Sequence, residues 1–516
     1  MQAEIDWLQQ LGTDEDEVGN SVVVDGDNNY IYATGYNTSS DSSIGWVRKF
    51  YAKSGEQIWS TLLSNVTNTD DSEGRYIAVD DNNVYVLLLN KDSNKTLVTK
   101  LDLETGEEIW TYNFEYVSGA VDTCCSIVTD GNGSLYVTGY VNGSMLSPDG
   151  EALTSTGSPD VWIAKLSTDK ELNWIEQLGS SGSKSYSMDL AVDSSSNVYA
   201  VGYTTGVMPD TGASNDMASE DIWIAKYNSD GERKWIKQFG STNNQKEEAL
   251  SVAVDESGCV YATGITYGDL QGGTDTEYYS QQSWVAKFQA RDGEQVWLNQ
   301  FGDEIQSDAA PDITDDSFGV RMRGISVDNN GSVYIGGRTN GQLAALSSDP
   351  VATTSTSRDG LIVKYNAYTG KQVWLKQINS SEDELDNVKD ITIGPNGNIY
   401  LVGTTAGTIS EIDTSQGGND IWLAQLREVP DTNDELAQIL KRYIDYKVSQ
   451  STETVLEASD TTTTTTNSIS DTSSSLLEVA ADVVASDGNT DEDEESTAES
   501  PISVIGVVAS LTGSES

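Results

Sequence analysis

The residues with the clearest potential to bind a metal lie in one long insertion between strand-like runs. This insertion, residues 303–319, holds six acidic side chains and no basic one. Carboxylate oxygens are the ligands that Ca²⁺ prefers, although a charged surface loop is usually just solvated. Both interpretations stay open, and the sequence points to no other metal or cofactor as directly. The candidate calcium ligands are Asp303, Asp308, Asp312, Asp315 and Asp316.

A second insertion carries aromatic side chains outside any strand-like run. Tyr267, Tyr278 and Tyr279 lie within residues 266–282, whereas the other repeated aromatic residues fall at strand positions. Tyrosine offers an apolar ring and a polar hydroxyl, which suits contact with a glycan or a protein surface. We therefore predict that these three tyrosines bind the ligand.

The rest of the composition limits catalysis. The chain has no histidine, so the usual general base, the commonest zinc ligand and a Ser/His/Asp triad are all excluded. Its three cysteines, Cys124, Cys125 and Cys259, are too few for a disulfide scaffold or a zinc cluster. Whether the chain is an enzyme is left open, and a non-catalytic role is favoured.

Net charge excludes two classes of partner. The 516-residue chain has 82 acidic and 29 basic residues, a formal charge of −53. Phosphate backbones and anionic lipid surfaces would be repelled, so we expect no nucleic-acid partner. No apolar run approaches the roughly 20 residues of a membrane span, so we expect no membrane insertion.

A repeat positions these candidate residues. Seven units each contain a Trp that opens a short run, followed later by an apolar strand, an Asp-rich turn and a second strand ending near Gly. The seven landmarks are Trp7, Trp59, Trp110, Trp174, Trp235, Trp297 and Trp374. Four β-rich runs per unit, repeated several times, are typical of a β-propeller. The predicted fold is therefore all-β, a seven-bladed β-propeller of four-stranded antiparallel blades.

The two ends of the repeat region complete each other. Trp7 opens a fourth strand with no earlier strands, and the last unit supplies three strands up to Leu426. We predict that residues 7–11 pair beside residues 421–426 and close the ring, which removes a free sheet edge. The long insertions then gather on one face, where binding loops usually lie.

Beyond the repeats the composition changes. The predicted organisation is a propeller over residues 1–429, a short helix within 430–448 and a disordered acidic, Ser/Thr-rich tail over 449–516. The helix is indicated by apolar spacing over 434–448, with acids first and bases last. The tail lacks aromatic residues and has the composition of a disordered segment.

The repeated signature resembles a known family. Val-Asp-x-x-Gly-Asn-Val-Tyr-x-x-Gly-Tyr, Asp-x-Trp-x-Ala-Lys-Tyr and Trp-x-x-Gln-x-Gly are similar to the SBBP group of bacterial β-propeller repeats, over residues 1 to about 429. The best matches are units 174–234 and 235–296. The resemblance implies a non-catalytic domain of a secreted or surface protein and carries no catalytic residues. The start of the chain shows no signal-peptide pattern, so a cytoplasmic location stays open.

Two alternatives to a binding module remain. Cys124-Cys125 and the segments 101–110 and 365–374 resemble features of quinone-dependent propeller dehydrogenases, although those have eight repeats. Paired acids could also act on a polysaccharide. Our main hypothesis is a binding or structural module, involved for example in adhesion, that presents the loops of one face to a glycan or protein partner. Its oligomeric state is left open.

Overall fold

The computed structural model describes residues 2–38, 42–63, 71–93, 95–117, 121–212, 219–241, 245–271, 281–302, 319–339, 358–380, 385–409 and 418–429. The predicted helix within 430–448 and the tail over 449–516 lie outside these ranges. In the described part every element is a strand, so it contains no helix that could cross a membrane.

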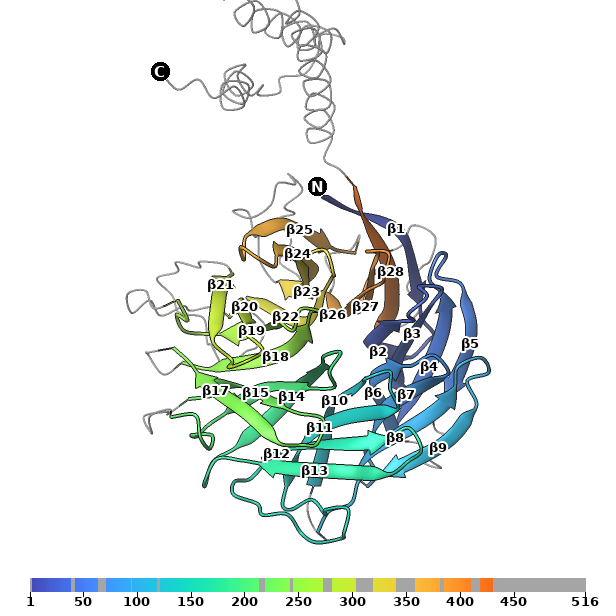
Figure 1. Cartoon of the computed structure of the whole chain (residues 1–516). Coiled ribbons are helices and arrows are strands. Elements are labelled where there is room, and N and C mark those ends of the chain that lie inside the picture. The colour runs from blue at the N-terminus through green and yellow to red at the C-terminus, as the bar shows by residue number, and fades with distance from the viewer. Residues whose placement is uncertain are drawn as a thin grey trace, which may run out of the picture. The chain divides into compact units, whose positions relative to one another are not determined.

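The strands form seven four-stranded antiparallel sheets arranged as blades around an axis (Figure 1). Blade 1 contains β2 (Asp16–Val24), β3 (Tyr30–Thr38), β4 (Ser43–Tyr51) and β5 (Gln57–Leu62). Blade 2 contains β6 (Ser72–Val79), β7 (Asn83–Asn90), β8 (Lys95–Asp102) and β9 (Glu108–Asn113). Blade 3 contains β10 (Val121–Thr129), β11 (Ser134–Asn142), β12 (Asp160–Ser167) and β13 (Leu172–Leu178).

Blades 4 to 6 follow the same order. Blade 4 contains β14 (Ser185–Val192), β15 (Val198–Thr204), β16 (Asp221–Tyr227) and β17 (Arg233–Phe239). Blade 5 contains β18 (Glu247–Val254), β19 (Val260–Thr266), β20 (Gln282–Phe288) and β21 (Gln295–Phe301). Blade 6 contains β22 (Val320–Val327), β23 (Ser332–Thr339), β24 (Asp359–Asn366) and β25 (Gln372–Ile378).

Blade 7 joins the two ends of the repeat region. It contains β26 (Asp386–Ile393), β27 (Ile399–Thr405), β28 (Asp420–Val429) and the first strand of the chain, β1 (Gln2–Leu11). Trp7 pairs with Gln425 and Leu11 with Ile421, as predicted. Figure 1 shows the blue first strand lying along the orange last one. The predicted seven-bladed propeller and its closure are confirmed.

The hydrophobic core lies between neighbouring blades. Each of seven buried clusters draws side chains from two adjacent sheets. The third-strand tryptophans are fully buried in these clusters: Trp46, Trp162, Trp223, Trp284 and Trp422. The repeated third-strand tryptophans therefore pack between blades.

A repeated hydrogen-bonded link explains the Lys and Trp of the signature. In blade 4, Lys226 Nζ and Trp235 Nε1 both donate to the Ala290 carbonyl of blade 5, at 3.1 and 3.0 Å. The Lys226 ammonium also lies 5.0 Å from the Tyr199 ring centre. Four other blades repeat this pair of donors, with Lys49 and Trp59, Lys100 and Trp110, Lys165 and Trp174, and Lys287 and Trp297. These side chains are therefore structural.

The recurring turn aspartates are structural as well. Asp193 Oδ1 accepts the backbone N–H groups of Ser195 and Asn197, each at 2.9 Å. Its other oxygen accepts the Tyr199 hydroxyl at 2.9 Å. An Asx side chain that caps its own turn in this way stabilises the turn and leaves little capacity for a metal.

Candidate functional site

The predicted ligand residues are only partly covered by the structure. Tyr267 is half-buried, and its hydroxyl accepts a hydrogen bond from Gln281 Nε2 at 3.1 Å. Tyr278 and Tyr279 lie outside the described residues, as do Asp303, Asp308, Asp312, Asp315 and Asp316. Within the described ranges, no three His, Cys, Asp or Glu side chains are grouped to hold a metal. The calcium and loop-tyrosine sites therefore stay predictions.

A different candidate site arises from an irregularity that all seven blades share. The first strand of each blade lies innermost, and its pairing with the second strand shifts register once. Such a β-bulge leaves one residue unpaired and re-aims the neighbouring side chains. The seven unpaired residues are Asn20, Arg75, Cys125, Met188, Leu250, Arg323 and Lys389.

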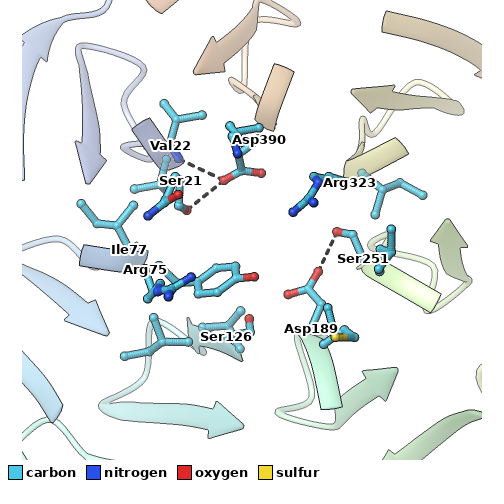
Figure 2. Close-up of a pocket in the computed structure, with 18 of the residues that line it drawn as sticks. Ser21, Val22, Arg75, Ile77, Ser126, Asp189, Ser251, Arg323 and Asp390 are labelled. Carbon is cyan, nitrogen blue, oxygen red and sulfur yellow. Dashed lines mark hydrogen bonds between the residues drawn. The ribbon is translucent and has the colours of Figure 1, made fainter. Parts of the chain in front are cut away.

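These bulges surround a cavity of about 310 Å³ on the propeller axis, lined by residues of all seven innermost strands. Figure 2 looks into this central cavity, where side chains from elements all around the axis converge. Three of the bulge residues that line it are basic: Arg75 from β6, Arg323 from β22 and Lys389 from β26. The cavity thus gathers positive charge inside a strongly acidic protein.

Further guanidinium groups raise the positive potential around Lys389. Burial, and after it the charges of Arg323, Arg338, Arg75 and Arg321, together lower the pKa of Lys389 from 10.5 to about 7. Among the residues that the structure describes, the Lys389 ammonium makes no hydrogen bond and no ion pair. A desolvated cation without a counter-ion is costly, because the lost hydration is not replaced.

Some of these arginines do have acidic neighbours. Arg75 forms an ion pair with Glu73, and Arg321 Nη2 lies 3.5 Å from Glu248 Oε2. Arg323 is exposed and lines the cavity. Arg75, Arg323 and Lys389 therefore all line the cavity, and Arg75 is also held by Glu73.

Two carboxyl groups complete the charged lining. Asp390 Oδ2 accepts the Ser21 hydroxyl at 2.8 Å and the Val22 N–H at 3.0 Å, and Asp189 Oδ2 accepts the corresponding Ser251 and Val252 donors. Both links join one innermost strand to the next blade's (Figure 2). Burial raises the pKa of Asp189, and it raises the pKa of Asp390 to about 7.

The adjacent cysteines lie on the innermost strand β10 but are not among the residues that line the cavity. Cys124 and Cys125 are free thiols and are buried, and burial raises the pKa of Cys124 to about 12. Cys125 is the bulge residue of β10. A thiol with such a high pKa is rarely deprotonated and is therefore a poor nucleophile, so these cysteines serve as packing residues.

The sequence did not identify this site, because the repeat signature does not include the bulge position. One signal was present. Of the 29 basic residues, Arg75, Arg323 and Lys389 interrupt the innermost strands, where the best-matched repeats have Met188 and Leu250. A basic residue at an otherwise apolar strand position was the observation that could have located the cavity.

Comparisons with known proteins agree with this fold. The SBBP model, described as "Beta-propeller repeat", matches residues 173–207, and a model described as "Outer membrane protein assembly factor BamB" matches residues 281–448. The predicted SBBP-type repeat is thereby confirmed. The chain is 23% identical to "Regulatory protein FlaEY" of Caulobacter vibrioides over 349 residues, which is 62% of this chain and 34% of that protein. The chain thus spans about a third of that relative's length.

Solved structures with a similar arrangement share little sequence. They include a "Europium-containing methanol dehydrogenase" (10% identity, 83% of this chain and 93% of that chain, TM-score 0.39). Another is a quinohemoprotein alcohol dehydrogenase from Comamonas testosteroni (12% identity, 83% and 78%, TM-score 0.41). At these values no functional conclusion is drawn from either protein.

Proposed function

Proceeding from this chain as a β-propeller repeat protein, we propose that it is a binding module whose central cavity takes an anionic ligand. The observation that carries the proposal is the Lys389 ammonium, which lines the cavity with Arg75 and Arg323 and has no counter-ion in the described part of the chain. An anion in the cavity would supply the missing charge, and the site would then be electrically balanced.

The negative charge of the whole protein limits where an anion can bind. A formal charge of −53 repels anions from the outer surface, so affinity for an anion requires a local positive site. The cavity is small, at about 310 Å³, and can therefore hold a compact ligand or one residue of a longer one.

The proposal also agrees with the side on which the long insertions lie. The innermost strands begin at the connections from the preceding blade, the same class of connection that contains residues 303–319. A partner bound at that face could place one anionic group in the cavity. A glycan or protein partner at a cell or particle surface remains the broader hypothesis.

The test is a thermal-shift titration of the full chain with sulfate, phosphate and citrate, at constant ionic strength set with sodium chloride. A ligand that binds the native state raises the melting temperature by mass action. We expect a rise that saturates and that is lost in Lys389→Met and Arg323→Gln. Lys371→Met removes the same charge from an exposed turn and should behave like the unchanged protein. No saturable rise with any anion would refute the proposal.

One observation favours an enzyme as the second candidate. Asp189 and Asp390 line the same cavity, and both have raised pKa values, as a general acid requires. Both are engaged in hydrogen bonds between blades, which favours a structural role. Cleavage of an acidic polysaccharide that disappears in Asp390→Asn, with anion binding retained, would support the enzyme instead.

A further inference from the structure

Three tyrosines form an aromatic cluster across blades 3 and 4. Tyr186 on β14 pairs directly with Tyr203 on β15, and their ring centres are 4.7 Å apart with an interplanar angle of 26°. The ring of Tyr140 on β11 meets Tyr186 edge-on, with centres 4.9 Å apart and an angle of 78°. All three side chains are half-buried, so part of each ring reaches solvent.

The repeat of the blades relates this tyrosine cluster to the cavity, although its three tyrosines are not themselves lining residues. Tyr186 precedes the bulge residue Met188 by two positions, and the residue equivalent to Tyr186 in blade 1 is Val18. Val18 and its partner Tyr36 line the cavity, as does Met188. Because the blades repeat around the axis, Tyr186 and Tyr203 occupy the corresponding place in blade 4.

Two arginines occupy the equivalent place in blade 6. Arg321 precedes the bulge residue Arg323 by two positions and pairs with Arg338, so this pair is equivalent to Tyr186 and Tyr203. Glu248 of blade 5 connects the two groups. Its Oε2 lies 3.5 Å from Arg321 Nη2. Burial is the main cause of the raised pKa of Tyr203, and the charge of Glu248 raises this pKa further.

These residues therefore offer two kinds of ligand contact within a few blades. Tyrosine rings present apolar faces on which a sugar ring can stack, and their hydroxyls can bond to sugar hydroxyls. Guanidinium groups bind a carboxylate or sulfate through paired, charge-assisted hydrogen bonds. Glu248 is buried and paired with Lys246 at 2.8 Å as well as with Arg321, so it holds the Arg321 guanidinium in place.

We infer that the ligand of the central cavity is an acidic sugar residue of a glycan, whose ring lies on Tyr140, Tyr186 and Tyr203 and whose acid group meets Arg321 and Arg323. The inference rests on the proposed anion-binding function and names its substrate class. An inorganic anion would make no use of the tyrosines. A polyanionic nucleic acid would be repelled by the acidic surface beyond the cavity.

The test compares three ligands of similar charge by calorimetric titration of the full chain. These are a galacturonate trimer, a triglutamate peptide and citrate, with the methyl-esterified trimer as the uncharged control. We expect the galacturonate trimer to bind at least tenfold more tightly than triglutamate or citrate, and esterification to abolish binding. A sulfated trisaccharide tests which acid group the site prefers. If it binds more tightly than the galacturonate trimer, the acid group is a sulfate, and the ligand is still an acidic sugar.

Variants separate the tyrosines from the cations. Tyr203→Leu should weaken the galacturonate trimer about tenfold and leave citrate unchanged, whereas Tyr203→Phe should keep most of the affinity. Equal binding of triglutamate and the galacturonate trimer by the unchanged protein would overturn the inference while leaving the anion site intact. That comparison needs no variant, so a folding defect in Tyr203→Leu would not obscure it. Absence of binding by every anion would refute the proposed function itself.

Discussion

Replacing Lys389 by methionine should stabilise the protein, and by an amount that depends on pH. The pKa of Lys389 falls from 10.5 in the unfolded chain to about 7 in the folded protein. A difference of about 3.5 pKa units corresponds to about 5 kcal/mol, since one unit is about 1.4 kcal/mol. The side chain is largely buried, so solvent screening reduces this value little.

The direction follows from proton linkage. Between pH 7 and pH 10.5 the unfolded chain still holds the proton that the folded protein has released, so the stability contribution of Lys389 rises with pH. Methionine has no such dependence. We therefore expect Lys389→Met to be more stable than the unchanged protein by up to about 5 kcal/mol below pH 7, with the advantage shrinking toward pH 10.

Urea unfolding at pH 6, 8 and 9.5 measures this difference for each protein. Lys371→Met serves as the matched control, because Lys371 is exposed and the same charge is removed. Its free energy of unfolding should differ little from that of the unchanged protein at every pH. An offset of Lys389→Met that stays the same from pH 6 to pH 9.5 would refute the assignment of Lys389 as a buried cation without a counter-ion.

Three further predictions concern the links between blades. In urea unfolding, the free energy of unfolding of Asp390→Asn should rise relative to that of the unchanged protein by up to about 4 kcal/mol between pH 4 and pH 7. The reason is that the pKa of Asp390 is raised to about 7, so the unchanged protein loses stability as the pH rises through this range. A difference that is already complete at pH 4 would contradict this. Trp235→Ala should cost roughly 3 kcal/mol in the same assay, since it removes inter-blade packing and the bond to Ala290; a loss below 1 kcal/mol would argue against the link. Deleting residues 2–11 should expose the edge of β28 and produce aggregates in size-exclusion chromatography, and a stable monomer would contradict the closure.

The sequence predicted the fold because each blade repeats the same contacts. The spacing of Lys226 and Trp235 recurs in other blades because both side chains must reach one carbonyl of the next blade. The closure was predictable for the same reason, because a fourth strand at the start of the chain could pair only with a three-stranded unit at its end.

The central cavity could not be predicted in the same way. Strand side chains alternate between two faces, and a single bulge reverses that alternation for every residue beyond it. Nothing in the repeated signature marks the position of the bulge, so the direction of Arg323 and Lys389 could not be derived from spacing. The predicted calcium ligands and Tyr278 and Tyr279 fall outside the described residues and remain predictions, as does a surface location.

The central claim is that Lys389 lies in a cavity built for an anion, and proton uptake on binding tests it most directly. Calorimetric titration of the full chain with citrate at pH 8, in two buffers of different ionisation enthalpy, gives the number of protons bound with the ligand. At this pH Lys389 is mostly neutral, because its pKa is about 7. We predict an uptake approaching one proton per anion, which is lost in Lys389→Met. Binding without proton uptake, or uptake that persists in Lys389→Met, would contradict it.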